Sequence, residues 1–256
     1  MVMEQISGRM KRVVPSKGPD VDWRECAAFL DFDGTLAPLE NHPDKVALPD
    51  RERRLLLELS DRCNGAIAIL TGRELENIRQ YFKGILVVLS GSHGAEIDIL
   101  GDPKVVPGAD IEMDRCYAAA KAMADEHGLL IEKKAAAIAL HYRGRMEMRA
   151  QVIGLIDRLA ETCQEMTPLH GNMVSELTLR DYSKGTALIQ LINHPAFAGR
   201  RPVAIGDDTT DENAFRAAKS IGGLGLRIGS AETEANHVFD TRSDFVDWLE
   251  QTLETK

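Results

Sequence analysis

Residues 27–36 read Ala-Ala-Phe-Leu-Asp-Phe-Asp-Gly-Thr-Leu. The apolar start of this stretch predicts a buried β-strand, which ends in two carboxylates, Asp31 and Asp33. In an open α/β sheet, ligands bind just beyond the carboxyl ends of the strands. Carboxylates this close repel each other unless a cation or a shared proton is present. The stretch therefore predicts half of an active site, although a strand followed by a simple Asp-Gly turn is the plainer alternative.

Beyond this stretch, continuous apolar runs alternate with helical spacing, which is typical of a parallel sheet buried on both faces. Strands are expected at 66–70, 85–90, 202–205, 224–228 and 237–239, with helices at 49–62, 74–82, 183–192, 213–219 and 243–253. Between 108 and 180 the order becomes helix, two strands, helix, two strands, and Gly171-Asn172 is a hairpin signal.

We therefore expect an α/β fold, with a Rossmann-like, doubly wound parallel sheet as its core. The core would comprise residues 23–107 and 181–256, and residues 108–180 would form an inserted α+β cap domain. Residues 1–22 are polar with Gly and Pro, and we expect them to form a flexible tail.

Composition excludes several classes of protein. A formal net charge of −9 over 256 residues argues against a nucleic-acid interface, which needs a clustered basic face. It does not exclude an anionic substrate, because a local basic pocket or a metal can override the global charge. The four cysteines show neither Cys-x-x-Cys nor zinc spacing, which predicts reduced thiols in a cytoplasmic protein. No apolar run approaches the roughly 18 residues of a membrane span, and we see no signal peptide. The oligomeric state stays open, with a monomer favoured.

Thr71-Gly72-Arg73-Glu74 follows the second expected strand and permits two compatible interpretations. It fits a helix capping box, with Thr71 as the N-cap residue and Glu74 reaching back to it. It also fits a phosphate site, because a hydroxyl and backbone N–H groups at a helix N-terminus bind anions.

Lys184 lies at the start of an expected helix, where a cation has the wrong sign for the helix dipole. It is therefore either a solvated surface lysine or a residue that holds an anion against the helix end.

Three acids, Asp207, Asp208 and Asp211, crowd the turn after the strand at 202–205. One acid there would be a helix cap, whereas three acids facing Asp31 and Asp33 suit octahedral Mg²⁺. Together the segments supply a carboxylate nucleophile, a second acid, a hydroxyl, a lysine and a magnesium site. Phosphoryl transfer through an aspartyl-phosphate requires this set.

These segments resemble, in order, the four motifs of the haloacid dehalogenase superfamily: residues 31–36, Thr71, Lys184 and residues 206–211. The resemblance covers nearly the whole chain after the tail, and an acid at position 33 is the pattern of its phosphatases. Within the superfamily, residues 92–96, 132–143 and 175–177 resemble the trehalose-6-phosphate phosphatases. Thr71 stands where many members carry Ser, which keeps the hydroxyl.

The resemblance implies a Mg²⁺-dependent phosphatase that hydrolyses trehalose 6-phosphate through an aspartyl-phosphate, in trehalose biosynthesis. Asp31 would be the nucleophile and Asp33 the general acid and base. The further roles that it implies are Mg²⁺ ligation by Asp31, the Asp33 carbonyl and Asp207; phosphate binding by Thr71, Gly72, Arg73 and Lys184; and orientation of water or lysine by Asp208 and Asp211.

The expected cap should bind the sugar. Glu132 and Lys134 are two residues apart on an expected strand, so both side chains leave one face. They would form either a cross-strand ion pair on a solvated face or hydrogen bonds to sugar hydroxyls. The resemblance assigns the disaccharide to Glu132, Lys134 and Glu176, with His93 and Gly94 beside them at the core edge, and a cap over the site implies open and closed states.

Other functions remain open at this stage. The core motifs do not separate trehalose 6-phosphate from sucrose 6-phosphate or mannosyl-3-phosphoglycerate as the substrate. A non-catalytic phosphosugar-binding module is a further alternative, although it would have no use for a nucleophile and acid pair. Dehalogenase chemistry ranks last, because it needs no acid at position 33.

Overall fold

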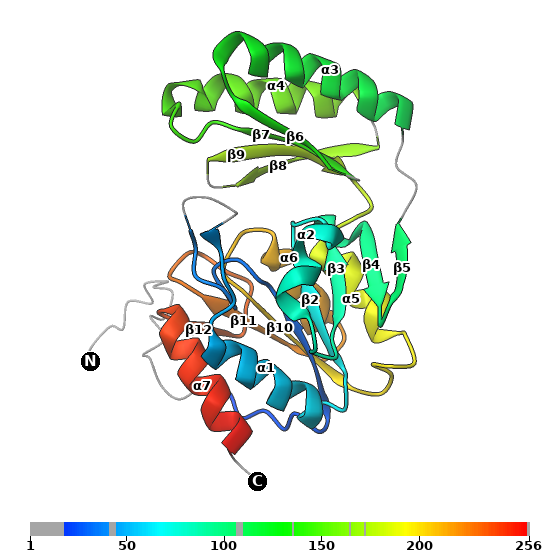
Figure 1. Ribbon diagram of the computed structural model, residues 1–256, viewed down its shortest axis with the longest axis vertical. Helices are drawn as coiled ribbons and strands as arrows, with labels where there is room; N and C mark the ends of the chain where they lie inside the picture. Colours follow the sequence, from blue (N-terminus) through cyan, green and yellow to red (C-terminus); the bar gives the residue numbers. More distant parts are fainter. Residues whose placement is uncertain are drawn as a thin grey trace, which may run out of the picture.

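The computed structural model describes residues 18–40, 45–105, 110–134, 136–163, 165–171 and 173–254. They form two separate β-sheets with helices packed on them, a large sheet below and a small sheet above in Figure 1. The large sheet has the strand order β12-β11-β10-β1-β2-β3-β4-β5, and the small sheet the order β6-β7-β9-β8. None of the helices in these ranges is both long and apolar enough to cross a membrane.

Strand β1 (Cys26–Leu30) lies in the middle of the large sheet, with all five residues buried. It pairs in parallel with β10 (Arg201–Gly206) on one side and with β2 (Ile67–Leu70) on the other. The parallel order continues to β3 (Val88–Gly91), β11 (Leu224–Ile228) and β12 (His237–Phe239). These apolar strands are buried on both faces, as their continuous hydrophobic runs predict.

Helices lie on both faces of the large sheet. In Figure 1, α1 (Asp50–Arg62) and α7 (Arg242–Glu254) lie on the near face and pack on each other. On the far face, α5 (Lys184–Ile192) packs against α6 (Asp211–Ser220). A short α2 (Leu75–Arg79) connects β2 to β3. This doubly wound arrangement confirms the predicted fold class.

The outer part of the sheet differs from the prediction. Two strands that the sequence analysis did not include, β4 (Glu96–Ile99) and β5 (Asp102–Val105), extend it antiparallel, so the sheet is mixed. Leu100 and Gly101 both have positive φ, which allows the tight turn that connects β4 to β5. The alternating sequence of β4 suits a strand with unequal faces, and its buried Asp98 is paired with Arg79 at 2.7 Å.

The predicted tail is also wrong at its end. Val21 is buried, and the indole N–H of Trp248 donates to the Pro19 carbonyl at 3.0 Å, so this segment packs on α7. Residues 1–17 of the predicted tail lie outside the described residues.

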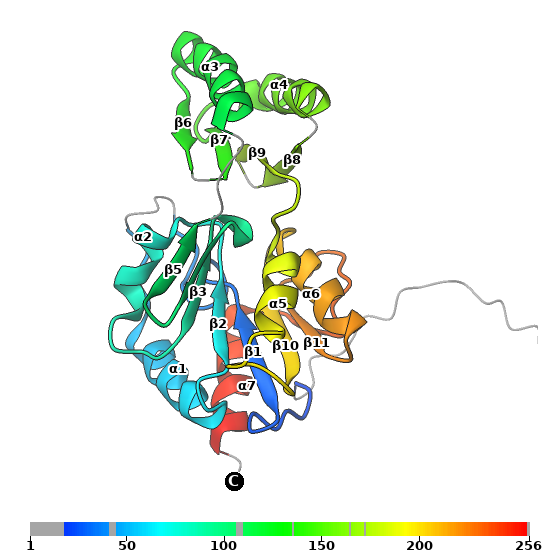
Figure 2. The ribbon, with the colours of Figure 1, turned by 90° about the vertical axis from the view of Figure 1, so that its right-hand side faces the viewer.

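The small sheet is antiparallel and carries its own core. It consists of β6 (Leu130–Lys133), β7 (Ala137–His141), β8 (Met166–Gly171) and β9 (Val174–Leu179). Helices α3 (Asp110–His127) and α4 (Arg149–Thr162) cover the face that points away from the large sheet (Figure 2). We call this segment, from α3 to β9, the cap. The boundaries predicted for it, 108 and 180, stay predictions, since residues 106–109 lie outside the described ranges.

Candidate active site

Three neighbouring parallel strands, β10, β1 and β2, bring the predicted residues to one edge of the large sheet. Asp31 follows β1, Thr71 follows β2 and Asp207 follows β10, as expected for the carboxyl ends of adjacent parallel strands. The turn after β1 requires glycine: Gly34 has φ +88°, and a Cβ there would lie 2.2 Å from Asp207 Oδ2. Close approach of the two acidic turns therefore depends on this glycine.

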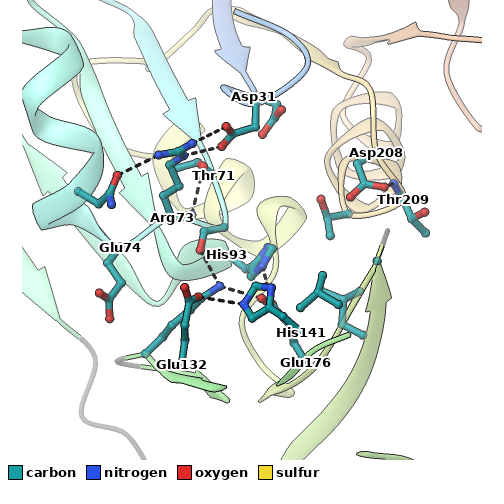
Figure 3. Close-up of a pocket in the computed structure, with 18 of the residues that line it drawn as sticks. Asp31, Thr71, Arg73, Glu74, His93, Glu132, His141, Glu176, Asp208 and Thr209 are labelled. Atoms are coloured by element: carbon teal, nitrogen blue, oxygen red, sulfur yellow. Dashed lines mark hydrogen bonds and ion pairs between the residues drawn. The ribbon is translucent and has the colours of Figure 1, made fainter. Parts of the chain in front are cut away.

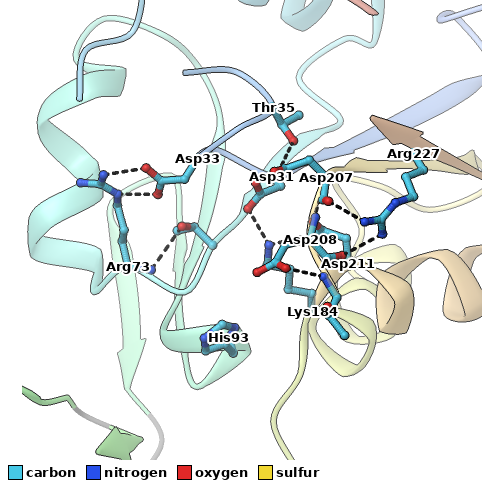
Figure 4. A network of polar contacts seen from close by, with 12 residues as sticks. Asp31, Asp33, Thr35, Arg73, His93, Lys184, Asp207, Asp208, Asp211 and Arg227 are labelled. Atoms are coloured by element: carbon cyan, nitrogen blue, oxygen red, sulfur yellow. Dashed lines mark hydrogen bonds and ion pairs between the residues drawn. The ribbon is translucent and has the colours of Figure 1, made fainter. Parts of the chain in front are cut away.

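Lys184 is buried between two carboxylates (Figure 4). Its Nζ donates to Asp31 Oδ1 at 2.5 Å and to Asp211 Oδ1 at 2.7 Å. Burial alone would lower the lysine pKa, but Asp211 and Asp31 outweigh it and raise the pKa, so the ammonium stays charged. The interpretation of Lys184 as a solvated surface lysine is therefore wrong. Ser183 caps α5 in a reciprocal pair with Thr186, which fixes the backbone next to the lysine.

Asp211 organises the acidic turn after β10. Its Oδ2 accepts the backbone N–H groups of Asp207 and Asp208, both at 3.0 Å, while its Oδ1 accepts Lys184. Asp207 is oriented by the Thr35 hydroxyl, which donates to its Oδ1 at 3.2 Å. Asp208 is exposed. Because both Asp211 oxygens already accept hydrogen bonds, Asp31 and Asp207 are the carboxylates best placed for a further ligand.

The acidic cluster fits a metal ion. Carboxylate oxygens of Asp31, Asp207 and Asp211 lie within 4.8 Å of one another. Burial raises the pKa of Asp31 well above its usual value, and Asp211 and Asp207 add to this against the opposing effect of Lys184. Burial, helped by Asp211 and Asp208, raises the pKa of Asp207 to about 6. Three carboxylates therefore share one lysine, and the negative charge that Lys184 leaves uncompensated adds to the rise in the pKa values of Asp31 and Asp207. A set of carboxylate oxygens of this kind suits a hard divalent cation.

Asp33 is held by Arg73. The guanidinium forms two hydrogen bonds to the carboxylate, at 2.6 Å and 2.7 Å, and a third to Asn77 Oδ1 at 3.0 Å. It also lies over the rings of Phe32 and Tyr81, 5.4 Å and 5.7 Å from their centroids. The side chain that the sequence suggested for phosphate binding therefore contacts the expected general acid.

The capping box predicted at 71–74 is wrong. Helix α2 begins at Leu75, with Glu74 as its N-cap residue, and the Leu75 N–H donates to Glu96 from β4. The Thr71 hydroxyl instead accepts the N–H of Arg73 at 3.2 Å, inside the loop. Thr71 is therefore part of the site rather than a helix cap.

The cap contributes a chain of polar contacts that reaches the core (Figure 3). Glu176 accepts from Lys134 Nζ at 2.7 Å, and its other oxygen lies 3.1 Å from His93 Nε2. Lys134 Nζ is also 3.4 Å from the Gly72 carbonyl. Burial alone would raise the pKa of Glu176, but Lys134 and His93 outweigh it and lower the pKa. A Cβ on Gly72 would lie 2.6 Å from the His93 ring, so this glycine admits the histidine.

Glu132 pairs with His141, the two side chains being 3.2 Å apart, and this contact lowers the pKa of Glu132. Glu132 thus has a partner on the neighbouring strand β7, and Lys134, just after β6, has one on β9. Both residues line a cavity rather than open solvent. Gly94 has φ +109°, and a Cβ there would lie 2.8 Å from the Ser183 carbonyl. Gly94 therefore allows the loop after β3 to pack on the start of α5, which is a different role from the sugar contact predicted for it.

One cavity of about 600 Å³ joins the two parts of the site. Its walls include Asp31, Asp33 and Lys184 from the core and Glu132 and Glu176 from the cap. Further lining residues that the sequence analysis did not assign include Leu39, Asn77, His141, Arg143, Leu169, Val174 and Thr209. Arg227, which contacts the acidic turn from β11, was also missed. A charged residue inside an otherwise apolar strand was the available signal.

Comparisons with known proteins agree with this geometry. The trehalose-phosphatase family model matches residues 29–244. A probable trehalose-phosphate phosphatase of Sinorhizobium fredii is 40% identical over 209 residues, covering 79% of this chain and 77% of the relative. A trehalose-6-phosphate phosphatase of Escherichia coli is 34% identical over 226 residues, covering 88% and 85%. The C-terminal domain of the C. albicans trehalose-6-phosphate phosphatase has the same fold, with a TM-score of 0.79 at 22% identity over 91% of this chain and 94% of that one.

The family match extends over most of the chain, and these two relatives share at least a third of their aligned residues with it. The chain belongs to the trehalose-phosphatase family.

Proposed function

We propose that this protein hydrolyses trehalose 6-phosphate to trehalose and inorganic phosphate, with Mg²⁺ as its cofactor. The observation that carries the proposal is the shared cavity, in which the buried Asp31–Lys184 pair faces sugar-compatible groups of the cap. The names of the two bacterial relatives support the same substrate.

In the proposed reaction, an Asp31 oxygen attacks phosphorus, and the bond from phosphorus to the sugar oxygen breaks as the aspartyl-phosphate forms. Lys184 orients the attacking carboxylate through its 2.5 Å hydrogen bond and lies where it can neutralise phosphoryl oxygens. Mg²⁺, held by Asp31, Asp207 and the Asp33 carbonyl, would supply further neutralisation of that charge. Water then cleaves the intermediate and releases phosphate.

Asp33 would give a proton to the leaving sugar oxygen and later take one from the attacking water, which is worth about 10²–10⁴-fold in rate. Both of its oxygens now accept from Arg73, so one of them must become free. We infer that the substrate phosphate draws the guanidinium from Asp33, which would combine the phosphate-binding role expected for Arg73 with its observed contact. The backbone at Gly72 and the Thr71 hydroxyl would hold the remaining phosphoryl oxygens.

The sugar would bind against the cap. Glu132, Lys134 and Glu176 line the cavity on its cap side and offer both acceptors and donors to hydroxyl groups. His93, on the core side, contacts the same Glu176. These residues would therefore select the disaccharide, while the core residues would carry out the chemistry on its phosphate.

We further infer a monomer that acts in the cytoplasm on a small phosphosugar, without a nucleic-acid or membrane partner. The net charge of −9 supports the absence of a nucleic-acid partner. The spacing of the four cysteines, with neither Cys-x-x-Cys nor a zinc pattern, favours reduced thiols and a cytoplasmic location.

The test is phosphate release from trehalose 6-phosphate, sucrose 6-phosphate, glucose 6-phosphate and mannosyl-3-phosphoglycerate, each with Mg²⁺ and with chelator. We expect strong preference for trehalose 6-phosphate and loss of activity with chelator. Metal-dependent activity that prefers another sugar phosphate would overturn the cap assignment and keep the core chemistry. No activity on any of them would favour a non-catalytic binding module.

A further inference from the structure

Arg227 lies in β11 with its side chain almost completely buried, directly beside the acidic turn. The strand register pairs it with Gly206, the last residue of β10 before Asp207. Its Nη2 donates to the Asp207 carbonyl at 2.8 Å, and its Nη1 to the Asp208 carbonyl at 3.3 Å. A buried guanidinium is costly unless its donors find acceptors, so an otherwise apolar strand carries this residue for its contacts.

The turn at Asp207 and Asp208 is thereby held from two sides (Figure 4). Its backbone N–H groups donate to the Asp211 carboxylate, and its backbone carbonyls accept from Arg227. The peptide group between Asp207 and Asp208 is held at both ends, its carbonyl by Arg227 and its N–H by Asp211, which fixes the direction in which the Asp207 side chain leaves the backbone. The Thr35 hydroxyl then orients the carboxylate itself.

Arg227 is itself anchored. Its Nη1 donates to Glu212 Oε1 at 2.7 Å, in the first turn of α6, and the other Glu212 oxygen accepts the Glu234 N–H at 2.8 Å. The Arg227 Nε has no hydrogen-bond partner among the described residues. The guanidinium is thus placed to reach the two carbonyls, even though one of its own donors stays unused.

We propose that Arg227 is a positioning residue that sets the affinity of the acidic cluster for its divalent cation. The inference rests on the proposed role of Mg²⁺. Removing Arg227 has two opposing effects on Mg²⁺ affinity, so the direction of the change shows which of them dominates. Removing the positive charge would tighten cation binding, because like charges repel. Removing the contacts would weaken it, because the Asp207 carboxylate is no longer held in position, and losses of support of this kind typically cost about 10–100-fold in metal affinity.

The experiment is Mg²⁺ binding measured by titration calorimetry for the wild type, Arg227→Met and Arg227→Lys, with phosphate release followed against Mg²⁺ concentration. Arg216→Met is the matched control: Arg216 lies on the exposed side of α6 and donates to Asn213 of the same helix. It removes the same charge from the same region without touching the turn. We expect Arg227→Met to bind Mg²⁺ about 10–100-fold more weakly, and phosphate release to require correspondingly more Mg²⁺.

Each outcome decides the proposal. Wild-type or tighter Mg²⁺ binding by folded Arg227→Met would overturn it, even if the melting temperature falls, because the arginine would then be structural only. If Arg227→Met does not fold, Arg227→Lys decides. Its ammonium keeps the charge but cannot contact both carbonyls and Glu212 as the guanidinium does, so wild-type affinity would refute the proposal and weaker binding would support it. If the wild type itself binds no Mg²⁺, the proposed cofactor fails together with this inference.

Discussion

Replacing Lys184 by Met tests the charge balance at the centre of the site. The substitution removes two charge-assisted hydrogen bonds, at 2.5 Å to Asp31 and 2.7 Å to Asp211, and leaves both carboxylates buried. Each such bond is worth about 1.5–3 kcal/mol, which gives about 3–6 kcal/mol together. Breaking a buried ion pair typically costs about 3–5 kcal/mol, in agreement. For a chain of this length, a loss of about 3–6 kcal/mol should lower the melting temperature by about 6–24 °C.

The sign of the pH dependence follows from the carboxylates. The folded-state pKa of Asp31 is already raised by burial, and loss of Lys184 removes the group that opposes this rise. A carboxyl group whose pKa is higher in the folded state binds protons preferentially there, so the variant should regain stability as the pH falls toward the usual pKa of the carboxyl. Added Mg²⁺ should recover part of the loss at neutral pH, because it supplies a cation to the same carboxylates.

The assay is urea unfolding of both proteins at neutral and mildly acidic pH, with and without Mg²⁺. Lys121→Met is the matched control, because Lys121 pairs with Asp125 on the exposed surface of α3, and we expect little change there. A loss at neutral pH below about 1 kcal/mol, or one that grows as the pH falls, would refute the proposed charge balance.

Three further outcomes are expected. Asp31→Asn should abolish phosphate release while the melting temperature stays near or above that of the wild type; activity in a sample shown by mass spectrometry to be free of deamidation would contradict the nucleophile assignment. Glu132→Ala should lower kcat/KM for trehalose 6-phosphate by about 10–150-fold, the value of one hydrogen bond to a charged group, and hardly change hydrolysis of a small aryl phosphate; equal losses on both substrates would exclude a sugar-binding role. Lys134 and His93 lower the pKa of Glu176 in the folded state, so these contacts should stabilise the fold above the usual pKa of the carboxyl group and lose this effect as the pH falls below it. The unfolding curves of the wild type and Glu176→Gln should therefore converge in acid. A difference in stability that stays constant with pH would contradict this role of the Glu176 contacts.

The core of the site follows from the sequence because it depends on strand ends alone. Once the apolar runs before Asp31, Thr71 and Asp207 are identified as neighbouring parallel strands, their polar ends must meet at one edge. The sequence alone could not place Lys184, because a position at a helix start fits both a surface and a buried side chain. Only the packing of α5 against the sheet, which buries the lysine, separates the two.

Side-chain partners could not be predicted in the same way, because they depend on distances between elements far apart in sequence. The pairing of Arg73 with Asp33 joins loops forty residues apart. The contact of Arg227 with the acidic turn depends on the register of β11 against β10. The strands β4 and β5 were not predicted for a local reason. Their mixed charged and apolar residues lack the continuous hydrophobic run that identified the other strands of the large sheet.

The contacts of the cap explain how one cavity could separate substrates that share a phosphate group. The proposed sugar-binding residues of the cap already have partners: Lys134 pairs with Glu176, and Glu132 pairs with His141. A sugar that displaces Lys134 must offer Glu176 hydroxyl groups in its place, because Glu176 is buried and a buried charge left without a partner is costly. A small aryl phosphate can react at the core without disturbing these pairs, but it gains nothing from them. Selectivity for the disaccharide would thus come from exchanging polar contacts that exist before the substrate binds. It should disappear when the charged cap residues are replaced by uncharged ones, whereas the chemistry at the core should persist.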